Sequence, residues 1–138
     1  MAKFEAFIVK SKIVLEVGGD QYPVTTCSYS FKRAKDFDGQ PASPTRCNEI
    51  KITMEATEKD KLLAWMAGNE LKDGSVTFKK RMDDTKLKEL KFKKAFIFDY
   101  EEAFDEGGTG TVTFSMCPEN IEVGEAKLSN EWVMDSAE

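Results

Sequence analysis

The stretch VTFKKRMDDTKLKELKFKKAFIFDY, residues Val76 to Tyr100, shows the strongest alternation of apolar and polar residues in the chain. A period of two is that of a β-strand with one buried face. Residues 82–85, Met-Asp-Asp-Thr, interrupt the alternation, and short aspartate side chains hydrogen-bond their own backbone where a chain reverses. The pattern predicts a central β-hairpin over 76–100. Its even positions are expected to face the core: Val76, Phe78, Leu90, Phe92, Phe96, Phe98 and Tyr100.

The bulk properties describe a single stable domain. The chain has 138 residues and a formal net charge of −5 at pH 7. We expect one domain over 1–138 that needs no disulfide for stability. Cys27, Cys47 and Cys117 are an odd number without paired spacing, which favours buried thiols in a reducing compartment. The acidic balance argues against nucleic acid as a partner.

The amino-terminal segment MAKFEAFIVKSKIVLEVGG alternates and is interrupted by Lys10 and Lys12. It lacks the continuous apolar run of a signal peptide or a membrane span. We therefore expect synthesis in the cytoplasm, no signal peptide and no membrane insertion.

Further elements flank the central hairpin. Gly18, Gly19 and Asp20 predict a hairpin turn, and shorter alternating segments cover 22–31, 50–56 and 111–116. Apolar residues at helical spacing, among them Trp65, predict one helix over about 58–67. The fold class expected is mainly β, an antiparallel β-barrel of seven to eight strands with one α-helix packed outside.

A long loop interrupts this regular pattern. Residues 35–46, KDFDGQPASPTR, combine two prolines, a glycine and small polar residues. Connections of about a dozen residues are usually functional or mobile. Phe37 near its start is a candidate anchoring side chain.

The sequence contains no set of residues suited to catalysis. It has no histidine, the commonest general base and metal ligand, and its cysteines lack zinc-site spacing. Glu101, Glu102, Asp105 and Glu106 form the densest acidic group, which we interpret as a solvated strand end and not as a glycosidase pair. The glycines at 107–110 precede a strand, whereas a phosphate loop precedes a helix. We expect no enzyme activity, no metal and no cofactor.

Several segments together resemble one family. They are CSYSF at 27–31, the D-x-D-G-x-P loop at 36–41, ITMEATEKDKLLAWM at 52–66, DGSVTFKKRMDDTKLKELKFKKAFI at 73–97 and NEW at 130–132. In this order and spacing they resemble the tube protein of type VI secretion systems, known as Hcp or TssD, in the form typical of Bacteroidetes.

The resemblance implies a β-barrel subunit of a contractile injection system. Such subunits form homohexameric rings that stack into a hollow tube, which a sheath expels to deliver effector proteins. Implied partners are other copies of the chain, sheath proteins, tip or baseplate proteins, and effectors in the lumen. Export through this apparatus would need no signal peptide.

Two surfaces are candidates for assembly. The central hairpin is basic near its turn and acidic at its far end, about 30 Å away if ten strand residues separate the groups. We hypothesise that these ends meet when rings stack. The stacking candidates are Lys79, Lys80, Arg81, Glu101 and Glu102. The assembly loop, expected to reach a neighbouring subunit or ring, comprises Asp36, Phe37, Asp38, Gly39, Gln40 and Pro41.

Two other functions remain open from the sequence. A small-ligand carrier is possible, since antiparallel barrels of about eight strands hold one small ligand, and Phe78, Phe92, Phe96, Phe98 and Phe114 are candidate cavity-lining residues. A related phage-tail-like tube protein is the other alternative.

Overall fold

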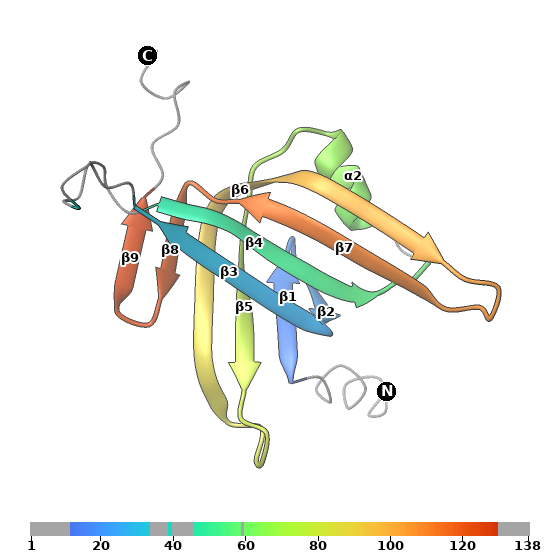
Figure 1. Ribbon diagram of the computed structural model, residues 1–138, viewed down its shortest axis with the longest axis horizontal. Helices are drawn as coiled ribbons and strands as arrows, with labels where there is room; N and C mark the ends of the chain where they lie inside the picture. Colours follow the sequence, from blue (N-terminus) through green and yellow to red (C-terminus); the bar gives the residue numbers. More distant parts are fainter. Residues whose placement is uncertain (1–11, 34–38, 40–45, 59, 130–138) are drawn as a thin grey trace.

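The computed structural model describes residues 12–33, 39, 46–58 and 60–129, which form nine strands and one helix (Figure 1). The elements are β1 (Ile13–Val17), β2 (Asp20–Pro23), β3 (Thr26–Lys32), β4 (Arg46–Glu55), α2 (Lys61–Ala67), β5 (Lys72–Lys79), β6 (Lys86–Phe104), β7 (Gly110–Cys117), β8 (Asn120–Val123) and β9 (Ala126–Ser129).

All strand pairs are antiparallel, in the order β2-β1-β5-β6-β7-β4-β3, and β8 and β9 continue from β6. The mainly β class with one helix is confirmed. The path is not closed, however, so the predicted barrel is not confirmed. Its end strands β2 and β3 follow each other in the chain, separated by Val24 and Thr25. The amide nitrogens of these two residues donate to Ile13 O (2.9 Å) and Thr53 O (2.8 Å), so the chain turns a corner here.

The strand count is nine in the described residues, not seven or eight, because the segment after β7 forms a hairpin of its own. β8 and β9 pair with each other across Gly124, whose φ of +59° suits glycine. The prediction of a turn at Gly18 and Gly19 is confirmed. Both have positive φ, as a two-residue hairpin turn of this type requires.

β6 is the strand that organises the sheet. Its first half pairs with β5 and β8, and its second half pairs with β7. The predicted hairpin is therefore right for 76–95, but beyond Ala95 the chain leaves β5. β6 carries an extra residue at Leu87, one near Lys94 (φ +52°) and one at Phe98. Such β-bulges bend a strand and shift the direction of its side chains.

The bulges change which side chains of β6 point to the core, so the predicted core face is partly wrong. Leu90 and Phe92 are buried as expected, but between the last two bulges the buried residues are Ala95 and Ile97. The prediction that Phe96 and Phe98 face the core is wrong. Phe98 is 46% exposed, and its ring contacts Phe96 at 6.4 Å between centroids, on the opposite face.

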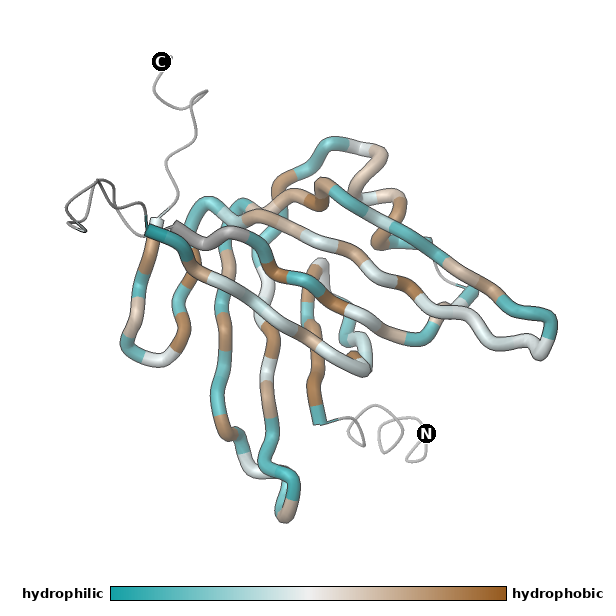
Figure 2. The backbone as a smooth tube through the Cα atoms, viewed as in Figure 1, coloured by the Kyte–Doolittle hydropathy of each residue, from teal (hydrophilic) through white to brown (hydrophobic). Residues whose placement is uncertain are grey.

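The core lies between two layers of the bent sheet. Strands β3, β4 and β7 cross over β1 and β5 (Figure 1), and one cluster of buried residues joins both layers. Ile50, Ile52 and Phe114 contribute from one layer, and Leu15 and Val76 from the other. Hydropathy alternates along the strands (Figure 2), as expected for half-buried sheets.

Helix α2 packs on this core through Leu62 and Trp65, while the Trp65 indole Nε1 donates to Glu70 O at 2.8 Å. The prediction of Trp65 as a core anchor is confirmed. The helix begins at Lys61 and not near 58. Asp60 occupies the N-cap position, but its side chain makes no capping hydrogen bond. Among the described residues no helix is long and apolar enough to cross a membrane.

Gly74 is a position where the fold needs glycine. A Cβ atom there would lie 2.5 Å from Glu16 O and 2.6 Å from Phe92 Cζ. We expect Gly74→Ala to lower the free energy of unfolding by about 1–3 kcal/mol, because the backbone of β1 cannot give way. Urea denaturation measures this change. Gly107→Ala, at an exposed turn position, is the matched control, and equal midpoints for the two variants would contradict the packing argument.

Candidate assembly surfaces

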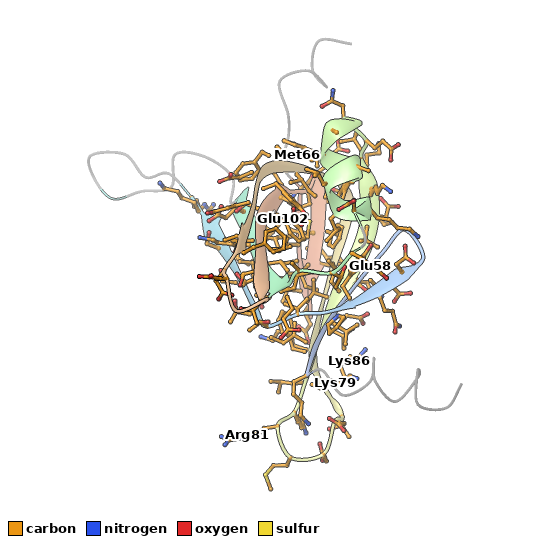
Figure 3. The ribbon with its side chains drawn as sticks, turned by 90° about the vertical axis from the view of Figure 1, so that its right-hand side faces the viewer. Glu58, Met66, Lys79, Arg81, Lys86 and Glu102 are labelled. Atoms are coloured by element: carbon orange, nitrogen blue, oxygen red, sulfur yellow. The ribbon has the colours of Figure 1, made fainter. Side chains whose placement is uncertain are left out.

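The β5–β6 turn, residues 79–86, is the first predicted surface and is here called the basic turn. It projects from the molecule, with Lys79, Arg81 and Lys86 along it (Figure 3). Lys80 N donates to Thr85 O at 2.7 Å, and the Asp83 carboxylate accepts from the Thr85 hydroxyl at 2.8 Å. The predicted aspartate turn is thus confirmed. It closes the hairpin and leaves Lys80 and Arg81 exposed.

Acidic residues moderate the charge of the basic turn. Asp84 forms an ion pair with Lys12, whose Nζ also donates to Lys80 O at 3.1 Å. Hydrogen bonds from Thr85 hold the pKa of the Asp83 carboxyl below its ordinary value, so it stays ionised. Cationic side chains still outnumber acidic ones in this hairpin end, so its outer part presents a positive surface.

The second surface is the far end of β6, here called the acidic end, residues 101–106. Glu101 is exposed, whereas Glu102 is half-buried and accepts from the Tyr100 hydroxyl at 3.5 Å. Asp105 accepts hydrogen bonds from the Thr109 hydroxyl and amide, which lower the pKa of its carboxyl. These carboxylates make a second projecting end with the opposite charge.

The bend in β6 changes how the two surfaces are related. A straight hairpin would place them at two ends of one axis. In the structure the basic turn and the acidic end project in different directions (Figure 1). In Figure 3, which looks onto the acidic end, Glu102 lies well away from the basic turn. The two charged surfaces therefore project in different directions and are not collinear.

The assembly loop is largely outside the described residues. Asp36, Phe37, Asp38, Gln40 and Pro41 are not described, and the structure therefore leaves this prediction open. Gly39 alone is described. It is exposed and has a φ of +84°, a conformation that side chains other than glycine rarely adopt.

The aromatics proposed for a carrier cavity do not gather around one. Phe92 and Phe114 are each 1% exposed and pack in the core, and Phe96 and Phe98 lie on the other face of β6. Two surface grooves, one of about 510 Å³ and one of about 320 Å³, are lined by other residues. This arrangement favours a packed subunit over a carrier.

The described residues offer no metal centre. No group of three or more cysteine, aspartate or glutamate side chains among them is arranged to hold a metal ion. Burial raises the pKa of the Cys27 thiol to about 11. This thiol is therefore a poor nucleophile at neutral pH.

Sequence reasoning missed two features of the surface. One is Phe104, 68% exposed in the acidic end. The other is the groove beside the β8–β9 hairpin, which includes Lys127. The alternation of Ile121, Val123 and Leu128 around Gly124 was the available signal for that hairpin.

The architecture described above is similar to that of two solved structures. Hcp1 from the E. coli EAEC 042 pathovar matches with a TM-score of 0.70 at 11% identity, covering 88% of this chain and 99% of that one. The sheath-tube complex of an extracellular contractile injection system, PVC, matches with a TM-score of 0.60 at 16% identity, covering 85% and 90%. At such identities the likeness shows the fold alone.

Closer matches show the family. The model of the hemolysin coregulated protein Hcp (TssD) family matches residues 9–133. Hcp1 from Flavobacterium johnsoniae is 37% identical, with a TM-score of 0.77, over 86% of this chain and 98% of that one. A comparison with curated proteins gave no match. The chain belongs to the Hcp (TssD) family, as the sequence resemblance indicated. Its function is that of this family, a structural tube subunit of type VI secretion.

The environment of Tyr100 gives a test of the acidic end. Burial, and then the negative charge of Glu102, raise the pKa of Tyr100 to about 12 from its ordinary 10.0. This residue's contribution to stability is fully present below pH 10 and is lost as the pH rises towards 12. We expect Glu102→Gln to lower the pKa of Tyr100, measured by ultraviolet titration of tyrosinate in a Tyr22→Phe, Tyr29→Phe background.

The control is Glu101→Gln, which removes a neighbouring carboxylate from the other face of β6. It should leave the Tyr100 titration unchanged. Identical titration curves for both variants would show that Glu102 does not act on this tyrosine.

Proposed function

We propose that this chain forms rings of six copies, which stack into the hollow inner tube of a type VI secretion apparatus. The observation that carries the proposal is the 37% identity with the Flavobacterium johnsoniae Hcp1, of which this chain covers 98%. The tube is expelled by a contractile sheath and delivers effector proteins. Its partners are other copies of the chain, sheath proteins, tip or baseplate proteins and effectors in the lumen.

The bent sheet of the subunit suits this role. The corner at Val24 and Thr25 leads the chain from β2, at one end of the sheet path, to β3, at the other end. Specific contacts between subunits then come from projecting turns.

Charge complementarity supports the contact between rings. Lys79, Lys80 and Arg81 of the basic turn face Glu101 and Glu102 of a copy in the next ring. The two surfaces differ, so the contact is heterologous, and a heterologous contact that does not close propagates along an axis. Opposite charges favour the correct orientation of approach more than they add affinity.

A tube of a related injection system, built like a phage tail, is the second candidate. The likeness of fold to the PVC sheath-tube complex supports it. The two candidates share ring formation and stacking and differ in the machine that holds the tube.

Negative-stain microscopy of the purified chain tests the proposed function. We expect annular particles, and stacks of them at high protein concentration. A protein that light scattering shows to be monomeric at every concentration would overturn the proposal.

Reversing the charge of Glu101 and Glu102 tests the stacking contact. We expect Glu101→Lys with Glu102→Lys to abolish stacks and to leave single rings intact, since like charges would then meet between rings. Stack length is measured by microscopy. Adding Lys79→Glu, Lys80→Glu and Arg81→Glu to the same chain should restore stacks, and tubes of normal length from the first variant would contradict the contact.

Deletion of residues Asp38 to Ser43 tests the assembly loop. We expect weaker assembly, measured by sedimentation velocity, with an unchanged urea midpoint. The loop is proposed to contact a neighbouring subunit without supporting the core of its own subunit. An unchanged assembly state would count against this role.

A further inference from the structure

A groove of about 510 Å³ lies where the β8–β9 hairpin joins β6. Lys91 and Lys93 line it from β6, and Lys127 and Leu128 line it from β9. Ile121 and Leu128 border the groove, but their side chains pack toward the core, on the face of the strands opposite the lysines. The apolar surface of the groove is therefore that of the lysine methylene stems, next to their ammonium groups, which suits an aromatic ring accompanied by carboxylates.

Strand register explains why the cations lie together. Lys91 is opposite Glu122 on β8, and Glu122 is opposite Lys127 on β9, so the three form a row across the strands. Lys127 pairs with Glu122 at 3.6 Å. Within the described part of the chain, Lys91 and Lys93 form no ion pair. The groove therefore carries a net positive charge.

Phe104, at the acidic end, has the complementary properties. It is 68% exposed, although it is a large apolar residue. Its ring lies against bare backbone at Gly110, where a Cβ atom would come within 2.4 Å of the ring. The ring thus rests on the Gly110 backbone and remains mostly exposed. Asp105 and Glu106 follow it directly and are exposed.

The groove and Phe104 cannot meet within one chain. The β8–β9 hairpin and the β6–β7 turn lie on opposite sides of the molecule (Figure 1). A surface that fits Phe104 and its carboxylates is therefore offered by a second copy of the same chain.

We propose that the β6–β7 turn of one copy docks into the β8–β9 groove of another. The Phe104 ring packs on the methylene stems of the groove lysines, and the Glu106 carboxylate faces Lys91 and Lys93. Asp105 keeps its bonds to Thr109 and adds a second negative charge. The contact rests on the proposed function, since it names one interface between subunits of the tube.

This contact differs from the stacking contact described above. It uses the apolar side chain at the tip of the acidic end, and its acceptor is the groove instead of the basic turn. Buried aromatic anchors surrounded by polar contacts supply most of the affinity in many interfaces. Charged residues around Phe104 then restrict which surface accepts it.

Carbodiimide coupling of the assembled full-length chain tests the docking directly, because this reagent joins a carboxylate to an adjacent amine without a spacer. We expect mass spectrometry to find Glu106 or Asp105 joined to Lys91, Lys93 or Lys127. In a mixture of heavy-isotope-labelled and unlabelled chains, these links should join one labelled to one unlabelled chain. Links confined to single chains, or no such links in assembled particles, would overturn the proposal.

Variants test the energetics of the same contact. We expect Phe104→Ala to weaken association between copies roughly tenfold, measured by sedimentation velocity, while Leu63→Ala on α2 does not. Lys93→Glu should weaken association as well, and Lys93→Glu with Glu106→Lys in one chain should restore it. Lys51→Glu, the same charge change on exposed β4, is the control. Unchanged association of Phe104→Ala, or no restoration by the charge exchange, contradicts the docking.

Failure of this inference is distinguishable from failure of the proposed function. Annular particles without the expected links leave the tube subunit in place and overturn the docking alone. A chain that forms no annular particles overturns the proposed function itself.

Discussion

The bend of β6 is the constraint on which the rest of the structure depends. β6 has 19 residues and pairs with β5 and β8 along its first part and with β7 along its second. One strand can serve both layers only if its direction and its side-chain alternation change on the way. The extra residues near Lys94 and at Phe98 make this change. Asp73 accepts from Lys94 N at 2.9 Å, which fixes the bulge near Lys94.

The layers formed in this way enclose one apolar core. Residues such as Leu15, Ile52 and Met116 are buried from both sides. In the part of the chain that the structure describes, no buried side-chain nitrogen or oxygen lacks a hydrogen-bond partner. The interior holds apolar and hydrogen-bonded side chains, and the charged side chains lie at the projecting turns. The same organisation that stabilises the subunit therefore also separates its basic and acidic surfaces.

Much of this was predictable from local pattern. Alternation placed Ile52, Val112 and Phe114 in the core, aspartate chemistry placed the turn before Thr85, and helical spacing placed Trp65. Prediction failed where an extra residue shifts the alternation. Nothing in FKKAFIF marks Lys94 or Phe98 as bulged, since a bulge depends on what the neighbouring strands require. The family resemblance indicated the function, whereas the direction in which each charged end projects depends on a bend that no local pattern encodes.

The continuity of β6 has a mechanical consequence. The residues next to the basic turn and those of the acidic end belong to one uninterrupted backbone, from Lys86 to Phe104. A push on one end reaches the other through peptide bonds, which are far stiffer than packing contacts. β5 pairs with the first part of this backbone and β7 with the second, while β8 pairs with residues 90–93 along the other edge. A displacement of either charged end is therefore passed along one hydrogen-bonded strand to both layers of the sheet.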